Sequence, residues 1–142
     1  MEEKTSLKYL FDASALYPLL KRFGAQVYDL TAHIAILDLT KYEIGNALWI
    51  ETRRNIIKNW RTLAEAWMKV IKKFKELTIE DLAEVEKIAV KLGLTFYDAA
   101  YIATAHRNKL ILVSQDREML NKAGEIDVGT LSLDEFIKLR RF

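Results

Sequence analysis

The sequence predicts an α/β fold in which a parallel sheet is covered by helices on both faces. Short apolar runs, such as residues 34–37, alternate with segments whose apolar residues recur at helical spacing. Consecutive apolar positions are typical of strands buried on both faces. The 142-residue chain is 51% hydrophobic and has one proline and five glycines, which leaves little room for long irregular loops. We therefore expect residues 1–142 to form a single domain.

The first half of the chain opens with a strand that leads directly into a helix. Pro18 lies in the first turns of that helix, where proline is tolerated, and Ser14 is its expected cap. Thr40 is expected to cap a later helix. In order, the expected elements are a strand at about residues 7–11, helices at 14–23 and 27–30, a strand at 34–37, and helices at 40–57 and 60–75.

The second half repeats the alternation of helices and strands. Thr78 is the expected cap of a helix that Gly93 ends, and Asp98 lies in the helix that follows. Ser132 opens the last helix. The expected elements are a helix at 78–93, a helix that contains Asp98 and ends at about residue 107, and a strand at 110–113. They are followed by a helix at 117–123, a strand at 126–130 and a helix from 132 to about 141.

Four carboxylates occupy positions that suggest chemistry. Asp12 and Asp116 each follow a strand, whereas Glu43 and Asp98 lie in the first turns of helices. Ligands of an open parallel sheet bind beyond the carboxyl ends of its strands. We predict that the strands ending at Phe11 and Val113 are adjacent and parallel, which places Asp12 and Asp116 at the same edge. If all four acids converge, only a hard divalent cation makes the site tolerable. This pattern indicates metal-dependent phosphodiester chemistry.

Helix capping is the alternative explanation for these acids. An acid three residues after a threonine or serine fits a capping box, and Asp116 also fits the cap of the helix at 117. Capping alone does not select the candidates, because Asp81 and Glu135 fit the same pattern without any chemistry. The four boxes are Thr40 with Glu43, Thr78 with Asp81, Thr95 with Asp98, and Ser132 with Glu135.

Composition restricts the metal to one held by oxygen. The chain has no cysteine and only two histidines, so thiolate chemistry is excluded and a zinc centre is disfavoured, which leaves Mg²⁺ or Mn²⁺. Asp12, Asp98 and Asp116 are the candidate ligands, directly or through water, and Glu43 is the candidate group that orients or deprotonates the attacking water. The polar residues that would position carboxylates or water, unless they serve only in capping or solvation, are Ser14, Asn46 and Ser114.

A basic strip follows the second candidate acid. The net charge of +2 identifies no partner, but residues 53–75 hold eight basic residues and only one acid. The strip is either a phosphate-binding surface for RNA or a solvated helix face. Trp60 and Trp67, seven residues apart, are expected in the core or in a homodimer contact formed by residues 53–74. The candidate RNA-binding residues are Arg53, Arg54, Lys58 and Arg61.

The ends of the chain and its apolar runs give an expectation for location. The first four residues are Met-Glu-Glu-Lys, without the apolar stretch of a signal peptide. No apolar run is long enough to span a bilayer. We expect a cytoplasmic protein without a membrane partner.

The motifs around the four acids resemble those of PIN-domain nucleases, in the family's order and over nearly the whole chain. Asp12 in Phe-Asp-Ala-Ser-Ala-Leu resembles the family's first acid, and Glu43 with Asn46 resembles the second. The segment Tyr-Asp-Ala-Ala-Tyr-Ile-Ala around Asp98 resembles the third motif. The fourth resembles Leu-Val-Ser-Gln-Asp, with Ser114 where many members have threonine.

That resemblance implies a compact three-layer α/β/α sandwich around a central parallel sheet. It also implies Mg²⁺- or Mn²⁺-dependent cleavage of RNA by an endoribonuclease. The size of the chain is similar to that of VapC-type toxins, which commonly form homodimers and are silenced by a small antitoxin encoded beside them. Some PIN domains instead serve in RNA binding or processing without strong activity, which is the alternative function.

A phosphatase of the haloacid dehalogenase type is the rival enzyme class, because it also begins with a strand followed by an aspartate. That family places a second acid two residues after the first, and here Ser14 occupies the position. Divalent-dependent RNA cleavage that EDTA abolishes separates a nuclease from a scaffold. Activity on phosphate monoesters favours the phosphatase.

Overall fold

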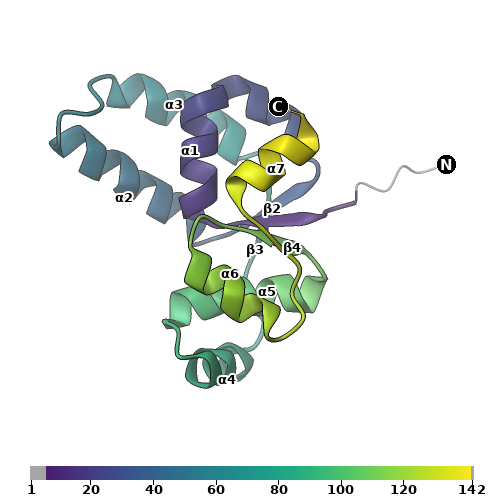
Figure 1. Cartoon of the computed structure of the whole chain (residues 1–142). Coiled ribbons are helices and arrows are strands. Elements are labelled where there is room, and N and C mark those ends of the chain that lie inside the picture. Colours follow the sequence, from purple (N-terminus) through teal and green to yellow (C-terminus); the bar gives the residue numbers. More distant parts are fainter. Residues whose placement is uncertain (1–5, 142) are drawn as a thin grey trace.

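A wholly parallel five-stranded sheet lies at the centre of the computed structural model, which describes residues 6–141 (Figure 1). Its strand order is β3-β2-β1-β4-β5. The short strands β1, β2 and β4 are apolar and almost wholly buried, as strands covered on both faces must be. The strands are β1 (Tyr9–Phe11), β2 (Ile34–Leu37), β3 (Lys75–Leu77), β4 (Ile111–Val113) and β5 (Thr130–Leu131).

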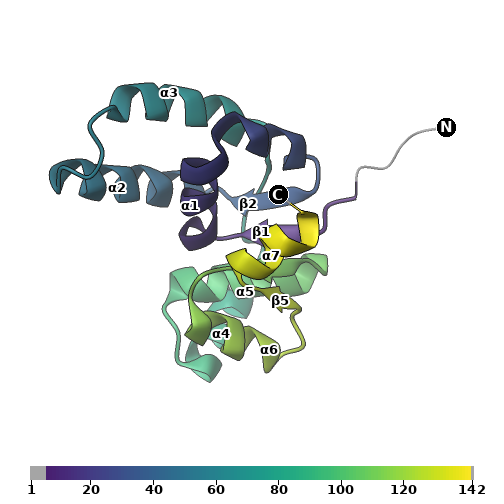
Figure 2. The same cartoon turned by 45° about the horizontal axis from the view of Figure 1, so that its top comes forward.

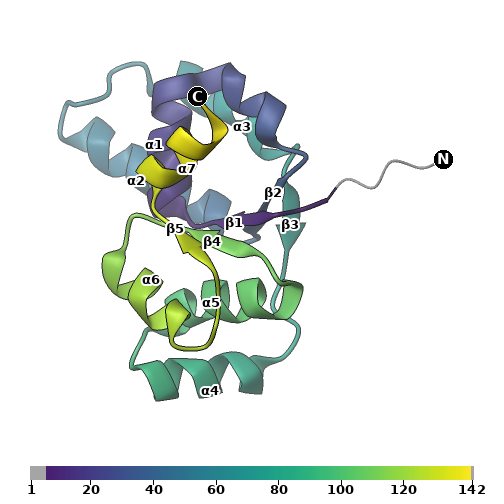
Figure 3. The same cartoon turned by 45° about the vertical axis from the view of Figure 1, so that its right-hand side comes forward.

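Helices cover both faces of the sheet, and the predicted three-layer α/β/α sandwich is confirmed (Figure 3). One layer contains α1 (Ala13–Phe23), the 3₁₀ helix η1 (Gly24–Leu30), α2 (Thr40–Arg53), α3 (Trp60–Ile71) and α7 (Leu133–Arg140). The other layer contains α4 (Leu82–Leu92), α5 (Phe96–Asn108) and α6 (Arg117–Gly124).

The core on the first face is rich in aromatic rings. Phe136 of α7 packs edge-to-face against Tyr9 and Phe11 of β1, at centroid distances of 5.0 and 4.9 Å. Trp67 of α3 packs in the same way against Tyr17 of α1 at 5.5 Å. Trp67 is therefore a core residue, since only 3% of it is exposed.

The core on the second face is built from small side chains of α5. Four alanines of this helix are buried, and their size allows the helix to lie close to the sheet. The larger Tyr101 and Ile102 are buried among them. Helix α5 thereby carries Asp98, at its first turn, to the edge where the strands end.

The strand order changes direction at β1, which lies between β2 and β4. Tyr9 pairs with Ile34 on one side and with Ile111 on the other, and Phe11 pairs with Val113. The predicted adjacency of the strands ending at Phe11 and Val113 is confirmed. Asp12 and the segment after Val113 consequently leave the sheet at one edge, at the position where α/β sheets bind ligands.

The edge strands differ from the prediction. The helix expected to reach residue 75 ends at Ile71, and Lys75–Leu77 joins β2 as an edge strand. Phe74 is buried between the two elements and anchors the turn. The last strand is also shorter than expected, with Thr130–Leu131 in place of 126–130.

Several expected caps are also wrong. Helix α1 begins at Ala13 with Asp12 as its cap, so Ser14 is not the cap. Leu39 is at the N-cap position of α2 and makes no side-chain cap, because Thr40 is already inside the helix. This helix ends at Arg53 instead of residue 57. Asp81 caps α4 in place of Thr78. The capping box of Ser132 is confirmed.

Within residues 6–141, none of the helices is both long and apolar enough to cross a membrane.

Candidate active site

Asp12 is the most buried of the four acids, with 5% of the residue exposed. Its backbone N–H donates to the carbonyl of Val113 at 3.2 Å, which continues the β1–β4 pairing. The hydroxyl of Ser14 (2.8 Å) and the backbone N–H of Ala15 (3.1 Å) donate to Oδ1. The hydroxyl of Ser114 donates to Oδ2 at 2.6 Å. The carboxylate orientation is thus fixed by groups from the start of α1 and from the segment that follows β4.

The same two serines hold the segment that follows β4. Ser14 Oγ accepts a hydrogen bond from the backbone N–H of Gln115 at 2.9 Å. Ser114 Oγ accepts one from the backbone N–H of Asp116 at 3.0 Å. Each serine therefore connects Asp12 to the start of α6, which supports their predicted role in positioning carboxylates.

Asp116 caps α6, as the alternative explanation proposed. Its Oδ1 accepts from the backbone N–H of Met119 at 3.1 Å. In the described part of the chain, Oδ2 accepts no hydrogen bond. One oxygen thus serves the helix, and the other is available to a ligand.

Asp98 is not a capping residue. The hydroxyl of Thr95 accepts from the backbone N–H of Asp98 at 3.1 Å, and the reciprocal bond of a capping box is missing. Across residues 6–141, the Asp98 carboxylate accepts no hydrogen bond from the protein. The capping explanation for this acid is therefore wrong.

Glu43 lies in the first turn of α2 and is half-buried. Its Oε1 accepts a hydrogen bond from the hydroxyl of Tyr101 at 2.6 Å. The expected capping box with Thr40 does not form, because Thr40 Oγ1 accepts from the backbone N–H of Leu37 instead. Glu43 is held by α5 and not by the start of its own helix.

The acids act on one another electrostatically. Burial raises the pKa of Asp12, and the charge of Asp98 adds to the rise against the hydrogen bonds that lower it. Burial is also the largest cause that raises the pKa of Glu43, and the charges of Asp12 and Asp98 raise it further. For Asp98, burial and then the charge of Asp116 raise the pKa. All four carboxylates therefore contribute to one negative region.

No lysine or arginine within residues 6–141 forms an ion pair with any of these four acids. Among the described residues, no group of three or more acidic or histidine side chains is already arranged around a single ion position. Oxygen donors with uncompensated charge suit a hard cation, and donors not preformed around one position suit a cation that keeps most of its water. Mg²⁺ and Mn²⁺ fit this donor set.

The predicted basic residues lie away from the acids. Arg53, Arg54, Lys58 and Arg61 are exposed around the turn between α2 and α3, at the end of that helix pair farthest from the sheet (Figure 2). Arg53 is ten residues beyond Glu43 on α2, about 15 Å along the helix axis. Asn46 is exposed one turn after Glu43.

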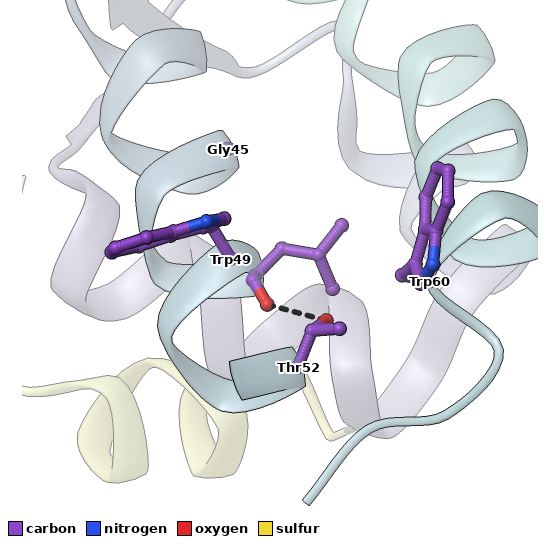
Figure 4. Close-up of a pocket in the computed structure, with 5 residues that line it drawn as sticks. Gly45, Trp49, Thr52 and Trp60 are labelled. Carbon is purple, nitrogen blue, oxygen red and sulfur yellow. Dashed lines mark hydrogen bonds between the residues drawn. The ribbon is translucent and has the colours of Figure 1, made fainter. Parts of the chain in front are cut away.

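An apolar groove lies between α2 and α3 beside these basic residues. Trp49 of α2 and Trp60 of α3 both line it (Figure 4). They are 55% and 47% exposed. The guanidinium of Arg53 lies 5.0 Å from the Trp49 ring, and that of Arg61 lies 5.1 Å from the Trp60 ring. The groove is lined by Gly45, Leu48, Trp49, Thr52 and Trp60.

Sequence reasoning missed Tyr101. This residue lies three positions after Asp98, and its hydroxyl is the hydrogen-bond donor to Glu43. Burial and the bond to Glu43 raise its pKa, so the hydroxyl keeps its proton. The available signal was a tyrosine placed between alanines, three positions after Asp98 in an alanine-rich helix.

Comparison with known proteins identifies relatives over most of the chain. The PIN domain family model matches residues 9–125. Exonuclease VapC9 of Pyrobaculum aerophilum is 46% identical over 126 residues, which cover 88% of this chain and 93% of that protein. Ribonuclease VapC3 of the same organism is 32% identical over 128 residues, covering 82% of this chain and 95% of that protein.

Solved structures agree with these relatives. The crystal structure of PAE2754 from Pyrobaculum aerophilum superposes with a TM-score of 0.81 at 39% identity, covering 96% of this chain and 91% of that one. FitAcB from Neisseria gonorrhoeae superposes with a TM-score of 0.60 at 17% identity, covering 88% and 97%. The second likeness concerns the fold alone.

Proposed function

Because the chain belongs to the PIN-domain family and its relatives are VapC nucleases, we propose that it is a divalent-metal-dependent ribonuclease, the toxin of a type II toxin–antitoxin pair. One observation carries the metal dependence. Four carboxylates share a negative region at the strand ends, and no cationic side chain of the described residues pairs with them. A bound cation is the partner that removes their repulsion.

In this proposal Asp12, Asp98 and Asp116 hold Mg²⁺ or Mn²⁺, directly or through water. Asp12 Oδ1 already accepts two hydrogen bonds, so Oδ2, which accepts one, is its oxygen with remaining capacity. The free oxygens of Asp98 and Asp116 complete the set. When bound, the cation lowers the pKa of a water and offsets the charge that develops on the phosphate oxygens.

Glu43 is the proposed group that orients or deprotonates the attacking water. Because Tyr101 occupies Oε1, Oε2 is the oxygen that remains to accept the proton. Burial keeps Glu43 a stronger base than an exposed glutamate, since its pKa is raised. The oxygen that leaves phosphorus takes up a proton from solvent as the phosphodiester bond breaks, and Glu43 then releases its proton to solvent.

RNA binding is the proposed role of Arg53, Arg54, Lys58 and Arg61. Their exposure leaves them free to contact phosphates on the same side of the molecule as α2. Phosphate contacts of this kind make affinity fall steeply with salt. Replacing Arg53 and Arg54 together by alanine is expected to weaken RNA binding and to reduce the slope of log affinity against log salt.

Partners are proposed on the same basis. Trp67 and Phe74 belong to the core, so only the exposed part of the region around residues 53–74 remains for a homodimer, together with the groove of Trp49 and Trp60. A small antitoxin encoded beside the chain is the proposed inhibitor, as the relatives' VapC names suggest.

The test is cleavage of a labelled RNA by the purified protein in Mg²⁺ or Mn²⁺, with and without EDTA. We expect cleavage that EDTA abolishes and that added cation restores. A circular RNA separates internal cleavage from exonuclease action, which matters because one relative is named an exonuclease. RNA binding without cleavage would instead support the inactive PIN-like module, and phosphate monoester hydrolysis would support the phosphatase.

A further inference from the structure

A chain of buried hydrogen bonds leads from the end of β2 to Glu43. The backbone N–H of Leu37 donates to Thr40 Oγ1 at 3.0 Å. Thr40 Oγ1 and the Tyr101 hydroxyl oxygen are 2.8 Å apart, and the Tyr101 hydroxyl lies 2.6 Å from Glu43 Oε1. Thr40 is fully buried, and only 2% of Tyr101 is exposed. Thr40 and Tyr101 are therefore shielded from water, and the chain of bonds reaches solvent only at the half-buried Glu43.

Counting protons gives the direction of every bond in this chain. A tyrosine hydroxyl has one proton, and an ionised carboxylate can only accept, so Tyr101 donates to Glu43. Tyr101 must then accept from Thr40, whose own hydroxyl oxygen accepts from Leu37. All donors therefore point toward Glu43, and bonds aligned in this way polarise and strengthen one another.

We propose that Tyr101 and Thr40 are positioning residues for the reaction: they fix the Glu43 side chain so that its second oxygen faces the other acids. This inference rests on the proposed function. A glutamate side chain has several rotamers, and the bond to Tyr101 selects one of them. Tyr101 cannot follow a moving glutamate, because its ring is packed among the small residues of the α5 core.

A second tyrosine–glutamate pair, whose glutamate also lies on α2, provides a matched control. Tyr17 donates to Glu51 Oε1 at 2.6 Å, two turns along α2 from Glu43. Glu51 also pairs with Lys21 at 2.8 Å. Glu43 differs because Tyr101 is its only side-chain partner within residues 6–141. Removing either tyrosine hydroxyl breaks the same kind of bond, but only one of the two bonds holds a proposed reacting group.

The experiment compares Tyr101→Phe with Tyr17→Phe in the full chain. We expect Tyr101→Phe to lower kcat for RNA cleavage about 10- to 100-fold, the usual effect of removing a supporting partner, while KM for RNA stays within about twofold. Tyr17→Phe should leave both constants within about twofold of wild type. Thr40→Val should lower kcat, and Thr40→Ser, which keeps the hydroxyl, should restore it. If Tyr101→Phe does not fold, the comparison of Thr40→Val with Thr40→Ser tests the inference.

A readout without catalysis separates this inference from the proposed function. Crystal structures should show one Glu43 conformer in the wild type and in Tyr17→Phe, and several in Tyr101→Phe or Thr40→Val. If the wild-type protein cleaves no RNA, the proposed function fails. The number of Glu43 conformers in the wild type and the variants still tests whether Tyr101 and Thr40 position Glu43. A folded Tyr101→Phe protein with wild-type kcat and a single Glu43 conformer would overturn the inference, as would an equal loss of kcat in Tyr17→Phe.

Discussion

Replacing Ser114 by alanine should destabilise the protein much more than replacing Ser14, although both hydroxyls make the same kinds of bond. Each donates to one oxygen of Asp12 and accepts a backbone N–H from the segment after β4. Burial distinguishes them, since Ser114 is fully buried and Ser14 is exposed. Water can replace the hydroxyl of Ser14 but not that of Ser114.

The magnitude follows from the bonds lost. A hydrogen bond to a charged group contributes about 1.5–3 kcal/mol, and an orphaned buried donor costs about 1–3 kcal/mol. Because Asp12 keeps its other partners, we expect Ser114→Ala to lower the free energy of unfolding by about 2–4 kcal/mol. At about 2.1 cal/mol/K per residue, this lowers Tm by roughly 7–13 °C. Ser14→Ala should lower the free energy of unfolding by less than about 1 kcal/mol.

Calorimetry and urea unfolding of both variants at pH 7 without divalent cations provide the measurement. Ser132→Ala is the control for an ordinary cap, because its hydroxyl bonds only to the start of its own helix α7 and to none of the four acids, and the expected loss is about 1 kcal/mol. A Ser14→Ala protein as destabilised as Ser114→Ala would refute the reasoning, because burial would then not control the strength of these bonds.

Three further predictions concern the charge cluster and the groove. Asp98→Asn should leave the metal-free Tm unchanged or higher, since it removes repulsion with Asp116, while Mn²⁺ stabilisation and RNA cleavage are lost; Asp81→Asn, at a true cap, should keep cleavage. Because the pKa of Asp12 is raised in the folded state, the folded protein binds more protons than the unfolded chain just above pH ~4. The contribution of Asp12 to the free energy of unfolding therefore falls as the pH rises through the folded pKa. Mn²⁺ should therefore raise Tm at pH 7 and not at pH 4, and an equal rise at both would contradict this. Sedimentation at micromolar concentration should show a dimer that Trp60→Glu dissociates, whereas a monomeric wild type would count against the dimer.

The sequence predicts the centre of the sheet well because its strands are self-contained apolar runs. Two such runs ending in aspartates were enough to predict that β1 and β4 are parallel neighbours, and the pairing of Phe11 with Val113 confirms it. The edge strand β3 was missed for the opposite reason. Lys75 and Glu76 are exposed, and nothing local marks them as a strand until β2 is present to pair with them.

The errors at helix caps have a common physical cause. A threonine before a helix looks like a cap on sequence alone, but its hydroxyl bonds to whichever partner the fold offers. Thr40 turns inward because Leu37 and Tyr101 are both available, and Tyr101 lies 61 positions away. Local patterns therefore selected the four acids and the two serines, whereas the support of Glu43 depends on long-range contacts that no local pattern contains.

The central place of β1 has a consequence for how the nascent chain acquires its site. Strand β1 is synthesised first, but Asp12 at its end cannot bond to Ser114 until β4 has been made, because the two residues are 102 positions apart in the sequence. Closing a loop of about 100 residues costs roughly 2 kcal/mol more entropy than closing one of about 10. High contact order slows folding, so assembly of the acidic centre is expected late on the folding pathway. An early folding intermediate, or a fragment that stops before residue 111, then contains Asp12, Glu43 and Asp98 without the strand that fixes the first of them. We therefore expect cleavage activity to appear only after β4 has joined the sheet and Ser114 has bonded to Asp12.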